Sequence, residues 1–364
     1  RARGKRVLVR DVLDRASRNI DQGALKDQPL VEAGIRTTLG YAYDSLGLYP
    51  HSESHFRRAL AIRQQLLGTE DRQTAASMAA LALEISVRED HDAAEPLIRR
   101  ALAIQQRILG DKNLETIGSL GTLGWILRAK GDIEGAEAVL RRTTELTRLV
   151  APDGDAMAAA LTNLGVLLMD KHDWDGAEPL LREALAINRK LHGELYRNVA
   201  RNLSNLAVIR KGRGDLKGAE RYWLEALRLQ RQILPADHPD TAWTLRLLGR
   251  VKQSQGDVAA AERYYRDSLD MERKVFGGQH PIVAEVLEDL SSALEDAGRE
   301  GQAVPLRREA LEIRVSRETV ALAAHSNDPA HLASLGDLHL RSGRFRSALD
   351  ELNRATALSR SNHW

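Results

Sequence analysis

Histidine pairs are the first side chains whose type and spacing suggest chemistry. His51 and His55 lie four residues apart in HSESH, so a helix would place both on one face, where they could bind a metal ion. His238 and His280 each precede a proline in similar segments. We interpret the first pair as exposed polar residues around a turn between helices and the second pair as loop and capping residues.

Other groups that catalysis would need are absent or isolated. The sequence has no cysteine, no HExxH motif, no Walker phosphate loop and none of the protein-kinase motifs. The acidic pairs Glu137/Glu145 and Asp153/Asp155 fall on faces or loops that we expect to be solvated. We therefore expect no catalytic residue, no metal site and no cofactor, and no enzyme activity in this chain.

The composition favours helices and argues against some partners. Charged residues make up 29% of the 364 residues, aromatic residues 4%, and the net charge is +2. This balance gives no reason to expect nucleic acid as a partner, and acidic residues surround the basic clusters RARGKR (1–6) and RKGR (210–213). No apolar run reaches the roughly 20 residues that span a bilayer, so we expect no membrane insertion by this chain.

An internal repeat must position any site. Eight leucines occupy equivalent positions, spaced 42, 42, 41, 42, 42, 42 and 45 residues apart. These core leucines are Leu39, Leu81, Leu123, Leu164, Leu206, Leu248, Leu290 and Leu335. Each is followed directly by Gly, Ala or Ser, and 13 positions later by Ser or Ala. Eight registered copies indicate a repeat architecture.

Each copy predicts two helices that pack closely at their small residues, with Leu and Ala forming the apolar stripe. We expect glycines to end the first helices in a left-handed conformation and aspartates to cap the second helices. These residues are Gly131, Gly214, Gly256, Gly298 and Gly343, and Asp132, Asp173, Asp215 and Asp257. Because one hairpin cannot bury its apolar face, the sequence predicts an all-α fold, a right-handed α-solenoid superhelix of about eight stacked antiparallel helix hairpins.

Pro179 stands inside the second predicted helix of its repeat, where proline normally costs about 3 kcal/mol. Pro96 and Pro305 occupy the same position in their repeats. This position lies about 200° around the helix from the small core residue, so it faces away from the packed side. We predict that the helix continues through Pro179 with a mild kink.

These repeated positions resemble the tetratricopeptide repeat (TPR). That family has a large apolar residue before Gly or Ala in the first helix, and Ala, an aromatic or aliphatic residue and Ala in the second. The usual TPR unit has about 34 residues, whereas the longer second helices here resemble the kinesin light-chain subclass. The resemblance covers residues 31–364 and implies a protein-interaction scaffold. We expect residues 1–30 to form a lead-in helix that packs on the first repeat.

Residues 9–21 and 25–49 also resemble the entry to the repeat region of bacterial serine/threonine kinases with repeat-containing C-terminal tails. The chain begins RARGKR without Met, and we interpret it as a piece of a longer protein. The resemblance implies a sensory or docking tail of a bacterial signalling protein whose kinase domain lies outside this chain. We expect a cytoplasmic location, or an extracytoplasmic one if a membrane span precedes the chain.

The first helices of such hairpins line a concave groove, where we expect partners to bind. Counted at helical angles, the sites two before, two after and five after each core leucine face this groove. The candidate partner-binding residues are Leu83, Trp125, Arg128, Val166, Met169, Lys211, Arg246 and Arg250, with Asn163 and Asn205 added for their amides. Trp125 near Val166 and Met169 predicts an anchor pocket, and packing between repeats explains Trp125 equally well.

Charge along the groove changes in the later repeats. Lys211, Arg246 and Arg250 predict a basic wall, after which acidic residues follow at Glu288 and Glu295. Asn163 and Asn205 could bond a peptide backbone, or they could bond the next repeat. The pattern favours a scaffold for a protein or an extended peptide that carries an apolar residue with acidic neighbours.

Two other functions remain open from the sequence. The chain could be a regulatory module that self-associates as a homodimer through the ends of the array. It could also be the non-catalytic part of an enzyme whose catalytic domain lies outside this chain.

Overall fold

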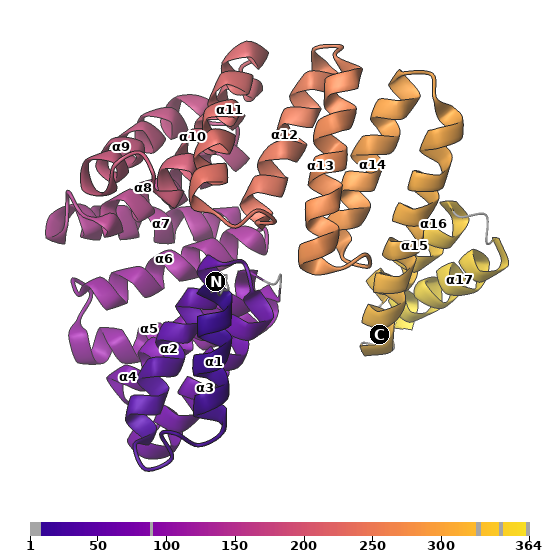
Figure 1. Ribbon diagram of the computed structural model, residues 1–364. Coiled ribbons are helices and arrows are strands. Elements are labelled where there is room, and N and C mark those ends of the chain that lie inside the picture. The colour runs from indigo at the N-terminus through magenta and orange to yellow at the C-terminus, as the bar shows by residue number, and fades with distance from the viewer. Residues whose placement is uncertain (1–8, 88–89, 325–328, 342–344, 362–364) are drawn as a thin grey trace, which may run out of the picture. The chain divides into compact units, whose positions relative to one another are not determined.

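The computed structural model describes residues 9–87, 90–324, 329–341 and 345–361, so the RARGKR cluster lies outside the described residues. Within these ranges every regular element is a helix (Figure 1). The helices are α1 (Val9–Asp21), α2 (Pro29–Ser45), α3 (Tyr49–Leu67), α4 (Arg72–Val87), α5 (His91–Leu109), α6 (Leu114–Ala129), α7 (Ile133–Val150), α8 (Asp155–Asp170), α9 (Trp174–His192), α10 (Arg197–Gly212), α11 (Leu216–Ile233), α12 (Pro239–Ser254), α13 (Val258–Phe276), α14 (Pro281–Asp296), α15 (Glu300–Ala324), α16 (Pro329–Arg341) and α17 (Phe345–Ser361).

From α2 onward the helices pair as hairpins, α2 with α3 through α16 with α17. We call the even-numbered helices A-helices and their odd-numbered partners B-helices. The chain divides into two compact units: unit 1 is Arg1–Pro235, with α1–α11, and unit 2 is Ala236–Trp364, with α12–α17. Inside each unit an A-helix also packs on the B-helix of the hairpin before it, which confirms the predicted all-α solenoid of stacked hairpins.

The core leucines and the small residues after them hold each hairpin together. All eight core leucines are at most 5% exposed. A Cβ atom built on Gly124 would lie 2.5 Å from Leu140, and one built on Gly249 would lie 2.6 Å from Tyr265. The side chains of the B-helix fill this space, so only a residue without a side chain fits at these two positions.

The turn inside each hairpin follows the predicted chemistry. Gly131, Gly214, Gly256 and Gly298 all have positive φ, and Gly343 lies outside the described residues. The carboxylates of Asp132, Asp173, Asp215 and Asp257 each accept a hydrogen bond from a backbone N–H in the first turn of the next helix. In the α8–α9 turn a non-glycine residue, His172, takes the left-handed conformation with φ 58°.

The three B-helix prolines lie on the outward side, as the sequence predicts. Pro96, Pro179 and Pro305 are exposed, and α5, α9 and α15 each continue through the proline. Water can hydrate the carbonyl that a proline on this face leaves unpaired. The free-energy cost of the proline is therefore smaller than it would be on the packed side of the helix.

The first hairpin is more polar than the others on the side that faces α1. Arg36 donates hydrogen bonds to Glu32 at 2.7 Å and to Asp21 at 2.8 Å. The later A-helices carry buried Met or Leu where Arg36 stands, for example Met78 in α4. The Tyr43 hydroxyl donates to Asp14 of α1 at 2.8 Å, so polar contacts hold α1 against α2.

Candidate functional site

The A-helix face of unit 1 is the side of α4, α6, α8 and α10 that faces away from their B-helix partners. It carries a row of uncharged side chains, each two residues after a core leucine. Leu83 is 41% exposed, and Trp125, Val166 and Val208 are half-buried. These side chains follow one another on successive A-helices, because α4 contacts α6 and α6 contacts α8. These four side chains therefore share one face of unit 1, on which Trp125 is the largest.

Two arginines lie over the Trp125 ring. The Arg128 guanidinium is 4.6 Å from the ring centroid and that of Arg201, on α10, is 5.9 Å away. Arg128 also donates to Asp170 at 2.6 Å, which fixes it beside the ring. Cation–π contacts of this kind orient an indole on a surface without burying it. Arg201 was not among the predicted site residues, because it lies five residues before its core leucine.

Asn163 and Asn205 lie directly before their core leucines, and both are half-buried. Neither amide has a hydrogen-bond partner among the described residues, and the Nδ2 atom of Asn205 is itself buried. The alternative, bonding to the next repeat, belongs instead to Asn202, which donates to Thr162 at 2.9 Å and accepts from Asn188 at 2.9 Å. The two amides on the A-helix face therefore offer unused donors and acceptors.

Two predicted positions in unit 1 differ from the expectation or are already engaged. Met169 is 9% exposed and packs in the main hydrophobic core, so its expected place in the groove is wrong. Met169 is the penultimate residue of α8, whose last turn is covered by the core. Lys211 is half-buried and already has an interaction partner.

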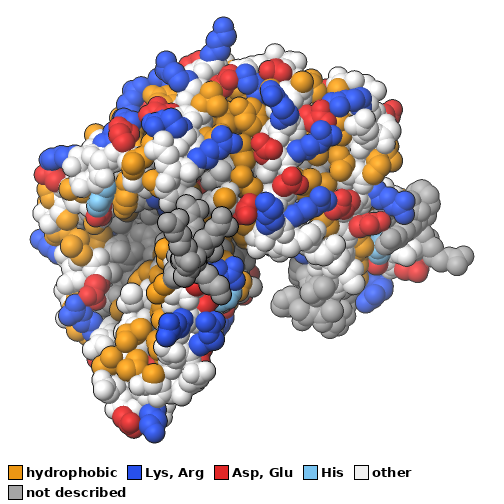
Figure 2. Space-filling view, viewed as in Figure 1, with side chains coloured by type: hydrophobic (Ala, Val, Ile, Leu, Met, Phe, Trp, Pro, Cys, Tyr) orange, Lys and Arg blue, Asp and Glu red, His pale blue; other side chains and the backbone are white. Residues whose placement is uncertain are grey.

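The predicted basic wall is wrong for unit 2, because acidic side chains already neutralise its arginines. Arg246 is 2% exposed and donates to Glu285 at 2.6 Å and to Asp289 at 2.5 Å. Arg250 donates to the same Asp289 at 3.0 and 3.1 Å. Burial alone would lower the pKa of Arg246, and the carboxylates of Asp289 and Glu285 raise it above its ordinary value. In the space-filling view, side chains of both signs alternate over α12–α14 (Figure 2).

Two notable residues of unit 2 escaped the sequence analysis. Trp243 is 43% exposed, and Arg246 lies 5.6 Å from its ring centroid. Glu272 is 2% exposed, its Oε2 atom has no hydrogen-bond partner, and burial raises its pKa to about 7. Trp243 could have been found from its place five residues before Leu248, one helical turn from the positions that were counted.

The histidines have structural roles. The expected exposure is wrong for His55, which is 5% exposed and stacks on Tyr43 with 5.4 Å between ring centroids. No group of metal-ligating side chains occurs among the described residues. The Nδ1 atom of His238 accepts the Asp240 N–H at 3.0 Å, and that of His280 accepts the Ile282 N–H at 3.3 Å. Their predicted capping role is therefore confirmed.

Comparison with family models identifies the family to which this chain belongs. A family model described as tetratricopeptide repeat matches residues 86–148, 156–231, 199–274 and 251–314, and a second model of that description matches residues 33–73. The chain belongs to the tetratricopeptide repeat family. A comparison of this TPR chain with curated proteins gives no match.

Solved TPR-like structures share the fold at low identity. A Rap protein complexed with Competence and Sporulation Factor is 11% identical with a TM-score of 0.56, covering 91% of this chain and 98% of that one. The apo form of RapI is 14% identical with a TM-score of 0.52, covering 79% and 97%. A putative kinesin light chain of Podosopora anserina is 18% identical with a TM-score of 0.45, covering 57% and 99%. The two Rap structures support the all-α repeat fold.

In the part of the TPR chain that the structure describes, no helix combines the length and apolarity that crossing a membrane requires.

Proposed function

We propose that the A-helix face of unit 1 binds an extended segment of a partner protein. As a TPR protein the chain is a protein-interaction scaffold. The observation that carries the finer proposal is the pair of unpartnered amides, Asn163 and Asn205, beside Trp125. Amide groups in proteins normally have hydrogen-bond partners. The half-buried Asn163 amide has none among the described residues and could bond a ligand directly, whereas the buried Asn205 Nδ2 atom would reach a ligand only after its side chain rotates toward the face.

An extended backbone suits this arrangement. Asn163 and Asn205 lie at the same position on α8 and α10, so a chain that crosses these A-helices would meet both amides in turn. A side-chain amide can donate to a peptide carbonyl and accept from a peptide N–H at once. Contacts of this kind hold a backbone without selecting a sequence.

Selectivity would come from Trp125 and the cations above it. A half-buried tryptophan in a row of Leu83, Val166 and Val208 provides contact area for an apolar side chain. The Arg201 guanidinium, 5.9 Å from the indole centroid, would favour an acidic residue beside that apolar one. The expected ligand is therefore an extended peptide with an apolar residue and an acidic neighbour.

Peptide display tests this proposal. A random dodecapeptide library is selected on the wild-type chain, and enriched peptides are synthesised and titrated by calorimetry. We expect Trp125→Ala to weaken binding about 30-fold, as for a hot-spot side chain worth about 2 kcal/mol. The double variant Asn163→Ala/Asn205→Ala should weaken it about 10-fold, and Trp243→Ala in unit 2 should leave it unchanged. Equal affinities for wild type and both unit 1 variants would contradict the proposal.

The wider setting remains a set of predictions. A docking tail of a bacterial signalling kinase, a cytoplasmic location and a homodimer through the array ends all agree with a scaffold role. At the N-terminal end, the Glu32–Arg36 ion pair replaces the apolar residues that other A-helices bury against a neighbour. The lead-in helix α1 covers this ion pair, because Arg36 also donates to Asp21 at 2.8 Å.

A further inference from the structure

The third hairpin departs from its own repeat at Thr144 in α7. Thr144 lies eight residues after the small core residue of the B-helix. Six other repeats have a leucine at this position, and only the last repeat also has a threonine. The leucines are Leu60, Leu102, Leu185, Leu227, Leu269 and Leu311. The Thr144 hydroxyl donates to its own helix at the Leu140 carbonyl, 2.9 Å away, so it needs no further partner. A side chain that the repeat pattern provides is missing at this point.

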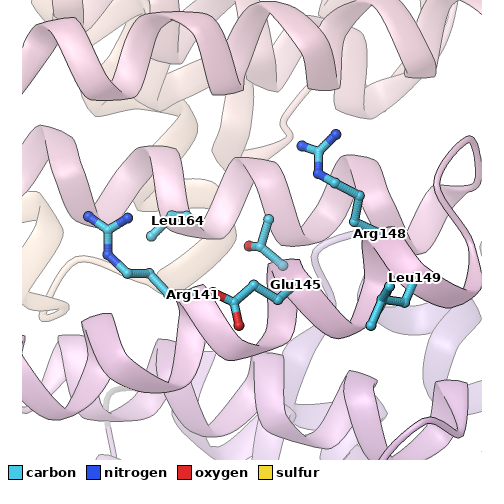
Figure 3. Close-up of a pocket in the computed structure, with 6 residues that line it drawn as sticks. Arg141, Glu145, Arg148, Leu149 and Leu164 are labelled. Atoms are coloured by element: carbon cyan, nitrogen blue, oxygen red, sulfur yellow. The ribbon is translucent and has the colours of Figure 1, made fainter.

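A pocket of about 380 Å³ occupies the place of the missing leucine. It is lined by Arg141, Thr144, Glu145, Arg148 and Leu149 of α7 and by Leu164 of α8. Figure 3 shows Leu164 behind α7, with Arg141 and Arg148 extending on either side of it. The core leucine of the fourth repeat thus lines a pocket of the B-helix, away from the A-helix face.

Leu149 at the rim is a second departure from the repeat. It is 72% exposed, the most of any large apolar side chain among the described residues. At the same position other repeats carry a polar residue: Gln65, Arg107, Lys190, Gln232, Lys274 and Ser316. The packing of the hairpins therefore does not require an apolar residue here, and a solvated leucine contributes nothing to folding. Leu149 extends the apolar lining of the pocket onto the surface, and a contiguous apolar patch of this kind can bind a partner.

The charges around the pocket specify what would bind there. Arg141 pairs with Glu137 at 2.7 Å, and Arg148 pairs with Glu183 of α9 at 2.9 Å. Glu145 has no ion-pair partner among the described residues, and its carboxylate lies apart from both guanidinium groups (Figure 3). Glu137 is shared with Lys171 at 2.5 Å, so these groups carry no net negative charge. Glu145 is the lining carboxylate that has no ion-pair partner among the described residues, and a basic group on the ligand would pair with it.

We propose that this α7 pocket is a second docking site, for a segment of a partner protein that carries a leucine-sized side chain beside a lysine or arginine. The apolar side chain occupies the volume that the repeat normally fills with its own leucine. Leu149 and the methylene groups of Arg141 and Arg148 cover it, and the basic residue pairs with Glu145. This ligand differs in charge from the acidic peptide of the A-helix face, so the two sites select different partners.

The decisive variant restores the repeat. Thr144→Leu should fill the pocket, raise the melting temperature by a few degrees and weaken docking at least 10-fold. Leu149→Gln, which restores a polar residue, should weaken docking without loss of stability, and Glu145→Gln should remove the preference for a basic residue. Leu66→Gln is the matched control, because Leu66 is an exposed leucine (48%) at the end of α3.

The probe is the random dodecapeptide library, selected on the wild-type chain and depleted on the Thr144→Leu variant. We expect the surviving peptides to contain Leu, Ile or Met beside Lys or Arg, and to bind Trp125→Ala as they bind wild type. The proposal is overturned if depletion leaves no peptide, or if the survivors bind Leu149→Gln and Leu66→Gln equally. A melting temperature lowered by Thr144→Leu would show that no leucine fits there.

A second copy of the chain is the competing occupant. Light scattering after size exclusion, at several concentrations, distinguishes the two. A dimer that Thr144→Leu abolishes would replace the partner segment by another copy and overturn the proposal as stated. The two proposals can fail separately. A negative result with Thr144→Leu would contradict docking at the α7 pocket but not peptide binding at the A-helix face, and a negative result with Trp125→Ala would do the reverse.

Discussion

The A-helix faces of the two units use the same repeat positions for different chemistry. Before and around the core leucines, unit 1 carries Asn163, Asn205 and Trp125, which are half-buried and mostly uncharged. Unit 2 carries Arg250 and Asp289 at corresponding positions, and these side chains pair with each other. A residue on this face is available for recognition only if no neighbouring repeat already satisfies it. The comparison therefore separates a binding surface from an internal ion-pair network.

Removing the central charge of unit 2 should give the largest effect. We expect Arg246→Ala to destabilise unit 2 by about 3–5 kcal/mol, because it leaves Glu285 without its ion-pair partner and the buried Glu272 without a nearby cation. Among the described residues, Asp289 then keeps only Arg250. Chemical denaturation followed by circular dichroism measures the change. Arg250→Ala is the control: its side chain is 36% exposed, so we expect less than about 1 kcal/mol. Similar losses for both variants would show that the network is not centred on Arg246.

The stability of unit 2 should depend on pH through Glu272. Its pKa of about 7, raised by burial, exceeds the ordinary 4.5, so the folded chain binds a proton that the unfolded chain releases. The stability that this proton provides is present below about pH 4.5 and is lost as the pH rises through about 7.

We expect Glu272→Gln to remove this pH dependence and to stabilise unit 2 at pH 8 by on the order of 2 kcal/mol. Thermal melts of wild type and variant between pH 5 and pH 8 provide the measurement. Leu66→Gln, at an exposed leucine of unit 1, is the control and should leave the pH profile of stability unchanged. Parallel profiles for wild type and Glu272→Gln would contradict the assignment.

The smallest expected effect concerns the turns, where the units follow the same rule with one exception. Unit 2 uses Gly256 with φ 81°, whereas unit 1 places His172 at φ 58° in the corresponding turn. A left-handed conformation costs a non-glycine residue about 1 kcal/mol. We expect His172→Gly to stabilise unit 1 by about 0.5–1 kcal/mol, seen as a higher melting temperature. A destabilised variant would show that the His172–Trp174 ring contact at 5.3 Å outweighs the strain.

Much of the candidate site was predictable one element at a time. The repeat positions of Leu83, Trp125 and Val166 place them on the A-helix face, because helical angles follow from sequence spacing. The predictions for Met169 and Arg246 were wrong for a common reason. Angles around one helix do not tell which side chain of the neighbouring hairpin covers a position, and that neighbour is 39 to 43 residues away in the ion pairs of Arg246.

The sequence alone determined the all-α hairpin array, its core leucines, its aspartate caps and the outward prolines, because these depend on local periodicity repeated eight times. The tertiary structure decided which polar groups remain available. Ion pairs between hairpins remove Arg246 and Arg250 from the candidate surface. Stacking of the hairpins also leaves the Asn163 and Asn205 amides without hydrogen-bond partners in the described part of the chain, and it leaves a pocket where Thr144 replaces leucine. The physical reason is that availability is a property of pairs of groups, and the pairs form only when the hairpins stack.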